Sequence, residues 1–177
     1  AMKQIVVLKY PSFTDELSAK MESFKKQLKQ KTYIRQVTVS GAVPGVEVAN
    51  YFTNRPYGSD QSEVKLIQMF AVDYDYLPTY SPDMVCGRAF SEEYGDELNK
   101  VVLNEEAVRL LGFSSNEAAL GRQLAMEVVE EPLQVIGVVR NYHQQSLAVP
   151  YKPIIFFIKE RVPFIGTPYI SIRMDGT

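Results

Sequence analysis

The chain of 177 residues has a hydrophobic share of 46% and a charged share of 23%, which is typical of one large globular domain or two small subdomains. Its formal net charge of −2, with basic and acidic residues interspersed, argues against nucleic acid as a partner. A single cysteine, Cys86, excludes an internal disulfide, and a single histidine, His143, leaves little material for a zinc or haem site. The longest apolar run, Ile154–Ile158, is far shorter than the roughly 20 residues that a membrane-spanning helix requires.

The first 40 residues predict a strand, a helix and a second strand. Gln4–Lys9 is β-branched and nearly continuous in its hydrophobicity, which predicts a strand covered on both faces. After Pro11, apolar residues at helical spacing predict a helix over residues 13–31, and they are Phe13, Leu17, Met21, Phe24 and Leu28. Ile34–Ser40 alternates its side chains and predicts the second strand of a β-α-β unit.

The next segment is punctuated by proline and glycine. Residues 41–60 therefore predict a long loop, with a short strand around Val46–Phe52. Val64–Val72 predicts a third strand, and Tyr74–Tyr80 predicts a short helical turn.

Two short helices are predicted in series near the middle of the chain. The strand Lys100–Leu103 leads into Asn104, a natural N-cap for a helix over Glu105–Leu111. Ser114 is predicted to cap a second short helix, which Gly121 closes.

The remaining sequence is expected to be mainly β. It predicts four strands, Arg122–Val129, Leu133–Arg140, Ile154–Lys159 and Tyr169–Met174. The acidic segment Glu130, Glu131 and Pro132 is predicted to form the turn between the first two of them.

Two groups of residues invite a chemical interpretation, and each also has a plain structural one. His143 and Ser146 could be a base and a nucleophile, but no nucleophile elbow accompanies them, so a capped turn is the simpler interpretation. A cluster of acids and tyrosines could bind a cation or a sugar, but it lacks the spacing of a calcium loop; it consists of Asp73, Asp75, Asp83, Tyr74, Tyr76 and Tyr80. The loops 41–63 and 141–153 are candidates for contact with a partner.

A series of short motifs gives the chain a resemblance to a known family. The motifs are Gly87–Phe90, Val101–Ala107, Leu111–Gly112, Ala119–Arg122 and Val135–Val139, in that order and spacing. Together they resemble the extracytoplasmic core domain of MacB-like ABC transporter permeases, particularly those of Bacteroidetes.

The resemblance implies an α+β fold with two subdomains. A membrane-proximal β-α-β subdomain would comprise residues 1–60 and 150–177, and an inserted β-rich subdomain would comprise residues 61–149. The motif residues would then be structural, and they are Gly87, Arg88, Phe90, Asn104, Glu105, Gly112, Gly121 and Gly137. Arg88 is expected to pair with Asp73 or Asp96.

The function implied by the resemblance is mechanical and not catalytic. The domain would lie in the periplasm as part of an inner-membrane permease, with no catalytic residues, cofactor or metal, and would pass ATP-driven movement to a substrate or partner protein. Its partners would be a cytoplasmic ATPase subunit, reached through a transmembrane part outside this chain, and a periplasmic adaptor or substrate protein, with a homodimer of the full permease also open.

Two alternatives remain at this stage. One is a periplasmic hydrolase or sugar-binding domain that uses His143, Ser146 and the Tyr/Asp cluster. The other is an activator of cell-wall enzymes, as in the related FtsX class. The permease interpretation predicts that both chain ends leave the domain on the same side, and that a family helix and strand expected after residue 177 would cover an otherwise exposed apolar face.

Overall fold

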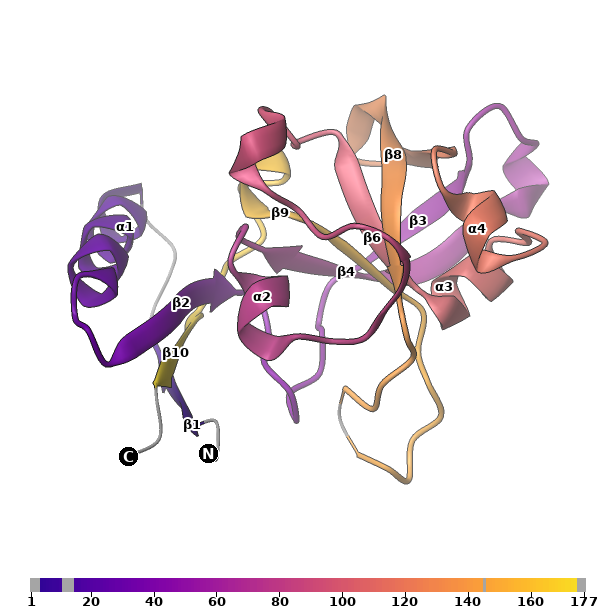
Figure 1. Ribbon diagram of the computed structural model, residues 1–177. Helices are drawn as coiled ribbons and strands as arrows, with labels where there is room; N and C mark the ends of the chain where they lie inside the picture. Colours follow the sequence, from indigo (N-terminus) through magenta and orange to yellow (C-terminus); the bar gives the residue numbers. More distant parts are fainter. Residues whose placement is uncertain (1–3, 11–14, 145, 175–177) are drawn as a thin grey trace.

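The computed structural model describes residues 4–10, 15–144 and 146–174. The strands are β1 (Gln4–Lys9), β2 (Ile34–Ser40), β3 (Tyr51–Pro56), β4 (Lys65–Val72), β5 (Met84–Gly87), β6 (Lys100–Asn104), β7 (Gln123–Met126), β8 (Val129–Val139), β9 (Ile154–Ile158) and β10 (Tyr169–Met174). The helices are α1 (Asp15–Lys29), α2 (Tyr76–Tyr80), α3 (Glu105–Leu110) and α4 (Asn116–Ala119) (Figure 1). The predicted α+β class is confirmed. Among the described residues, no helix has the length and hydropathy needed to cross a membrane.

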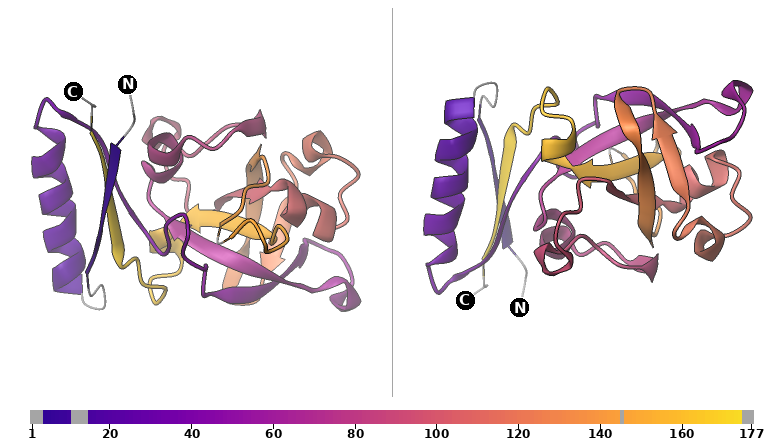
Figure 2. Two further views of the ribbon diagram at one scale, coloured as in Figure 1. Left: turned by 90° about the horizontal axis from the view of Figure 1, so that it is seen from below. Right: turned by 90° about the horizontal axis from the view of Figure 1, so that it is seen from above.

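The two ends of the chain build one small sheet, which we call the terminal sheet. β10 lies between β1 and β2 and runs antiparallel to both, so β1 and β2 are parallel but separated. The predicted β-α-β unit is therefore split by the last strand. α1 lies along the outer face of this sheet, on the side away from the rest of the molecule (Figure 2). We call α1 and the terminal sheet together the terminal unit.

The prediction that Gln4–Lys9 is covered on both faces is wrong. The bounds of β1 are as predicted, but Val6, Val7 and Leu8 are each more than 40% exposed. The reason is topological: β1 is an edge strand that pairs only with β10, and α1 packs mainly against the more buried strand β2.

The six strands β3, β4, β6, β7, β8 and β9 close into a barrel. Pairing runs from β4 through β3, β7, β8, β6 and β9, and the parallel pairing of β9 with β4 completes the ring. β5 adds to the barrel by pairing with β8. Closure leaves these six strands without free edges.

Continuous apolar runs in the barrel are explained by burial on both faces. In β9, Ile155 and Phe157 belong to one hydrophobic cluster, whereas Ile154, Phe156 and Ile158 belong to a second. All five side chains are at most 1% exposed. Strands of this kind lose the alternation of apolar and polar residues that marks a half-exposed strand.

A narrow backbone connection joins the terminal sheet to the barrel. β2 and β4 share one residue pair, Ser40 with Val72. Next to it the Gly41 N–H donates to the Ala71 carbonyl (2.8 Å) and the Asp73 N–H donates to the Val39 carbonyl (3.3 Å). The strand pairing favours subdomain boundaries near residues 41 and 168, because β3 and β9 pair within the barrel; the division into subdomains stays a proposal.

The predicted acidic turn is wrong. Glu130, Glu131 and Pro132 lie inside β8, and the tight turn between β7 and β8 is formed by Glu127 and Val128. The pairing shifts from Leu124 with Leu133 to Met126 with Val129, so the three residues form a bulge opposite one residue of β7. Proline is tolerated at such a bulge because no ladder hydrogen bond is required of it.

The other short elements lie close to the positions predicted from the sequence. The loop strand predicted around Val46–Phe52 lies later, at β3. The second short helix is capped by Ser115 and not by Ser114, since the Ser115 hydroxyl accepts from the Ala118 N–H (3.1 Å). β5 was not predicted. Residues 13 and 14 of the predicted first helix lie outside the described residues.

Candidate functional site

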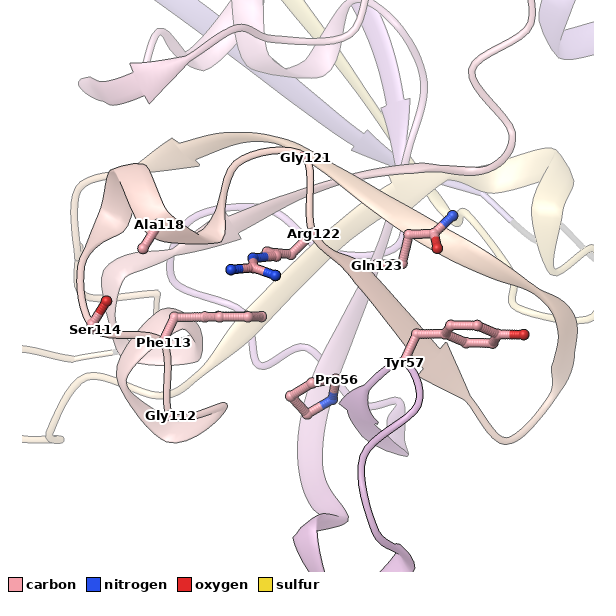
Figure 3. Close-up of a pocket in the computed structure, with 9 residues that line it drawn as sticks. All are labelled: Pro56, Tyr57, Gly112, Phe113, Ser114, Ala118, Gly121, Arg122 and Gln123. Carbon is pink, nitrogen blue, oxygen red and sulfur yellow. The ribbon is translucent and has the colours of Figure 1, made fainter.

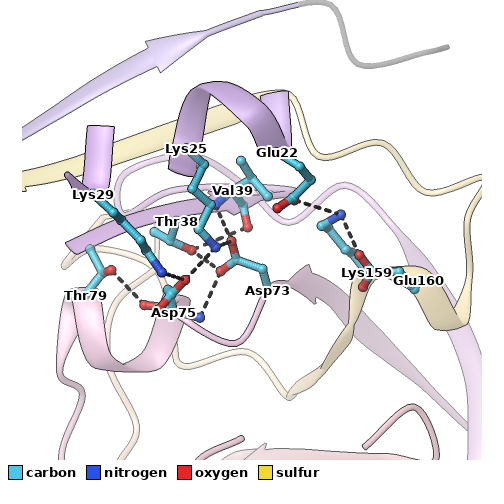
Figure 4. Close-up of polar contacts among 10 residues, drawn as sticks. All are labelled: Glu22, Lys25, Lys29, Thr38, Val39, Asp73, Asp75, Thr79, Lys159 and Glu160. Atoms are coloured by element: carbon cyan, nitrogen blue, oxygen red, sulfur yellow. Dashed lines mark hydrogen bonds and ion pairs between the residues drawn. The ribbon is translucent and has the colours of Figure 1, made fainter. Parts of the chain in front are cut away.

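Asp73 links the barrel to the terminal unit. It lies directly after β4, and the residue is 5% exposed. One carboxylate oxygen accepts from the Val39 N–H (2.9 Å) and from Lys25 Nζ (2.7 Å). The other accepts from the Thr38 hydroxyl (2.5 Å) and from the Asp75 N–H (3.1 Å). The carboxylate therefore ties α1, β2 and the segment before α2 to the end of a barrel strand (Figure 4).

A second acid and a second lysine extend this contact. Lys25, itself only 8% exposed, also approaches Asp75, whose Oδ2 lies 2.5 Å from its ammonium nitrogen. Lys29, one helical turn further along α1, donates to the same oxygen (2.6 Å). We call Lys25, Lys29, Thr38, Asp73 and Asp75 the junction cluster.

The charges of the junction cluster affect each other's protonation. Burial alone would lower the pKa of Lys25, but the carboxylates of Asp73 and Asp75 outweigh it and the net pKa is raised well above that of an ordinary lysine. Burial raises the pKa of the Asp73 carboxyl, and Lys25 opposes that rise. Burial likewise acts to raise the pKa of Asp75, but Lys25 and Lys29 overcome it and lower the pKa. Lys25 is therefore a cation near neutral pH.

Three further contacts hold the terminal unit. On the α1 side, Lys159 after β9 lies 3.4 Å from the Glu22 carboxylate (Figure 4). On the opposite face of the terminal sheet, the Tyr80 hydroxyl of α2 hydrogen-bonds with the Ser171 hydroxyl of β10 (2.7 Å). Arg173 donates to the carbonyl oxygens of Pro78 and Thr79 at 3.0 and 3.1 Å. The sheet is thus held between α1 and α2.

The sequence contained a signal for Lys25 that the prediction did not use. Lys25 stands four residues after Met21 and three before Leu28, so it lies on the apolar stripe of the helix and not on its solvated side. A lysine on a packed face requires a carboxylate partner. The sequence could not name that partner, because Asp73 is 48 residues away.

His143 and Ser146 do not form a nucleophile and base pair. His143 Nδ1 lies 3.1 Å from the Val149 carbonyl oxygen, and its ring packs on Tyr151 with ring centroids 4.5 Å apart. The Ser146 hydroxyl accepts from the Ala148 N–H (3.3 Å), which is the geometry of a capped turn. This arrangement gives the hydrolase interpretation no support.

The Tyr/Asp cluster is divided among structural contacts. Asp73 and Asp75 belong to the junction cluster, and Asp83 lies 3.5 Å from Arg140. The rings of Tyr76 and Tyr80 pack together with centroids 4.8 Å apart. Within the described residues, no group of three or more His, Cys, Asp or Glu side chains could hold a metal ion.

Two of the motif glycines allow a close approach of β5 to β8. Gly87 pairs with Gly137. A Cβ on Gly87 would lie 2.3 Å from the Ile136 carbonyl oxygen, and one on Gly137 would lie 2.2 Å from the Arg88 carbonyl oxygen. Only glycine fits at either position.

Asn104 and Glu105 fasten the end of β6. The Asn104 side chain is fully buried, and its oxygen accepts from the N–H of Ala107, which caps α3, and from the N–H of Ile154 (both 2.9 Å). Its amide donates to the Lys152 carbonyl (2.7 Å). Glu105 accepts from the Asn141 N–H (2.9 Å). One dipeptide therefore joins β6 and α3 to both ends of the loop 141–153.

The expected partners of Arg88 are wrong. Its guanidinium pairs with the buried carboxylate of Glu97 (2.5 Å) and stacks over the Tyr94 ring, 3.8 Å from its centroid. Asp73 is occupied by Lys25, and Asp96 instead accepts from the Leu98 N–H (2.8 Å). The neighbouring motif residue Phe90 is buried in one of the barrel's hydrophobic clusters.

The two loops expected to contact a partner pack against each other. The Gly45 N–H donates to the Gln144 carbonyl (2.7 Å), and the Gln144 side chain donates to the carbonyl oxygens of Val43 and Val46. Lys152 lies 3.0 Å from the Glu47 carboxylate. Their role in partner binding stays a prediction.

A groove lies on the barrel between the α3–α4 connection and the start of β7. It has a volume of about 510 Å³ and is lined by Pro56, Tyr57, Gly112, Phe113, Ser114, Ala118, Gly121, Arg122 and Gln123 (Figure 3). The motif residues Gly112 and Gly121 both have positive φ angles, +80° and +75°, which favour glycine.

The prediction about the chain ends is confirmed. Gln4 of β1 pairs directly with Met174 of β10, so the first and last described strands begin and end side by side (Figure 1).

Comparison with known proteins agrees with this architecture. The extracellular domain of the noncanonical ABC-type transporter YknZ from Gram-positive bacteria has a TM-score of 0.65 at 17% identity, covering 98% of this chain and 85% of that one. The periplasmic region of MacB from Actinobacillus actinomycetemcomitans has a TM-score of 0.63 at 17% identity, covering 97% and 74%. No curated protein sequence matches the chain. The model of the MacB-like periplasmic core domain matches residues 5–167, and the chain therefore belongs to that family.

Proposed function

We propose that this domain, as the extracytoplasmic part of an ABC transporter permease, passes ATP-driven movement of the membrane part to a periplasmic substrate or partner protein. The family implies a cytoplasmic ATPase subunit as the source of that movement. The chain acts in this proposal as a mechanical element and carries out no chemical step.

The observation that carries the proposal is the position of the chain ends. Gln4 and Met174 are partners in adjacent strands of the terminal sheet, so a displacement of either end acts on the same three-stranded sheet. A sheet loaded in this way moves as a unit because its strands share a hydrogen-bonded ladder.

The junction cluster supplies the next step of transmission. With a single β2–β4 residue pair, the backbone alone would leave the terminal sheet free to turn relative to the barrel. Asp73 restrains that rotation, because its carboxylate is held from α1 and from β2 at once. Ion pairs that are buried and fully hydrogen-bonded favour one arrangement of the packed elements over others.

The experiment measures whether the domain moves as one body in the full permease with its ATPase. Spin labels are placed at Lys31→Cys beyond α1 and at Glu130→Cys on the barrel, in a Cys86→Ser background. Double electron–electron resonance spectroscopy gives the distance between the two labels without nucleotide and in an ATP-trapped state. We expect the same narrow distance distribution in both states.

The Lys25→Met variant is expected to broaden the distance distribution, because the terminal unit can then turn relative to the barrel. The matched control is Lys20→Met, which removes a lysine of the same helix whose partner, Glu16, is exposed. A wild-type distance that changes between the two nucleotide states would contradict the proposal, because the junction would then be a hinge.

A further inference from the structure

The groove on the barrel contains one charged side chain, and the described residues give that side chain no partner. Among its nine lining residues only Arg122 is charged. No hydrogen bond or ion pair of the Arg122 guanidinium with another described residue is present, whereas Arg88, Arg109, Arg161 and Arg173 each contact an acid or a carbonyl. Arg122 and Phe113 point into the groove, while the Tyr57 ring points away along its rim (Figure 3).

We propose that this groove binds a segment of a partner protein that presents a carboxylate beside an apolar side chain. The carboxylate would pair with the Arg122 guanidinium, whose planar fork matches a carboxylate in a bidentate contact. The apolar side chain would pack on Phe113 and Pro56, which are half-buried in the free domain. Arginine and tyrosine are the residue types that dominate binding energy at protein interfaces.

The openness of the groove favours a protein segment over a small molecule. Most of the lining residues are exposed, so the groove is shallow and does not enclose what it holds. The exposed ones are Tyr57, Gly112, Ser114, Gly121, Arg122 and Gln123. A small-molecule site usually encloses about 70–90% of its ligand. A shallow groove can instead receive a segment whose other side remains attached to its own protein.

The position of the groove also suits a partner that approaches from outside. The terminal sheet lies at one end of the molecule, whereas α3, α4 and the adjoining ends of β3 and β7 lie at the other (Figures 1 and 2). The groove therefore lies far from the chain ends, at the end of the molecule opposite the terminal sheet. In this respect the inference rests on the proposed function and adds the chemistry of the partner.

The test uses two capped peptides and the chain itself. One peptide carries an aspartate next to a leucine and a phenylalanine, and the other carries asparagine in place of the aspartate. Both are titrated while the amide resonances of the domain are followed by NMR. We expect the acidic peptide to shift the resonances of Gly112, Ser114 and Gly121. The neutral peptide should bind at least about tenfold more weakly, since a hydrogen bond between charged groups is lost.

Variants distinguish this groove from general charge attraction. Arg122→Gln is expected to weaken binding of the acidic peptide to the level of the neutral one. Ser114→Trp is expected to fill the groove and to weaken binding of both peptides. Lys31→Gln removes an equal charge from an exposed site beyond α1 and should leave the binding of both peptides unchanged. Equal binding of the two peptides, or unchanged binding to Arg122→Gln, would overturn the inference. Such a result would leave the distance measurements on the permease unaffected, because they require no partner.

Discussion

The barrel and the terminal unit are stabilised by different means. The barrel closes on itself and buries two large hydrophobic clusters, one on each face of β4, β6 and β9. The terminal sheet has a small cluster of five buried apolar residues, Ile34, Val37, Val39, Ile170 and Ile172, and it meets the barrel through charged and polar contacts. Apolar burial is not directional, whereas an ion pair with several hydrogen bonds specifies an orientation. The comparison suggests that the barrel provides stability and the junction cluster provides alignment.

The largest effect is expected from a cavity in the barrel. Phe157→Ala removes a fully buried ring and should lower the free energy of unfolding by about 3–5 kcal/mol. Chemical denaturation monitored by circular dichroism measures it. Phe164→Ala is the matched control, since that ring is 71% exposed, and its cost should be below about 1 kcal/mol. Equal costs for the two substitutions would contradict the assignment of the core.

A smaller but more specific effect is expected at the junction. Lys25→Met leaves the buried Asp73 carboxylate without its cation and should cost about 3 kcal/mol, which corresponds to a fall in Tm of roughly 6–12 °C for a domain of this size. Lys20→Met, whose ion pair is exposed, should cost less than about 0.5 kcal/mol. The double variant Lys25→Met/Asp73→Asn should recover part of the loss, because it no longer buries an unpaired charge. Equal melting temperatures for the two single variants would show that the buried pair contributes no more than the exposed one.

Alkaline pH should weaken both regions through different groups. The pKa of Lys25 is raised by the carboxylates of Asp73 and Asp75, and burial raises the pKa of Tyr76, which lies in one of the barrel's two hydrophobic clusters. Above about pH 10 the unfolded chain releases these protons while the folded chain keeps them, so stability falls as pH rises, by about 1.4 kcal/mol per pH unit for each proton. Urea denaturation across this range should show a shallower fall for Lys25→Met and for Tyr76→Phe. A slope that neither substitution changes would contradict this origin.

The smallest effects are expected for the residues that had suggested catalysis. His143→Ala and Ser146→Ala remove a ring contact and a turn cap on the loop 141–153, and each should cost less than about 1 kcal/mol. Thermal denaturation is sufficient to measure it. A large loss of stability for either variant would mean that the loop contributes more to the barrel than its contacts indicate.

Local structure could largely be predicted from the sequence, and long-range pairing could not. The bounds of β1, β2 and β10 follow directly from short β-branched runs. Closure of the barrel depends on the parallel pairing of β9 with β4, which no periodicity encodes. The apolar run Ile154–Ile158 predicted a strand, but neither its burial on both faces nor the strands that pair with it.

The same limit applies to the candidate sites. Asn104 could be predicted as a helix cap because capping is local, and the structure adds its contacts with Lys152 and Ile154. The pairing of Lys25 with Asp73 depends on how the terminal unit docks, and it could not be predicted. The acidic turn was misplaced because charge and proline are shared by turns and by bulges, which only the register distinguishes.

Native-state hydrogen exchange tests most directly whether the junction cluster makes the two regions one body. In the wild-type chain we predict that the slowest amides of β2 and β10 exchange with the same free energy as those of β6 and β9, because the terminal sheet opens only when the barrel unfolds. In Lys25→Met, the β2 and β10 amides should exchange at a lower free energy while the barrel keeps its own. Wild-type amides of the terminal sheet that already exchange at a lower free energy than the barrel would contradict the account.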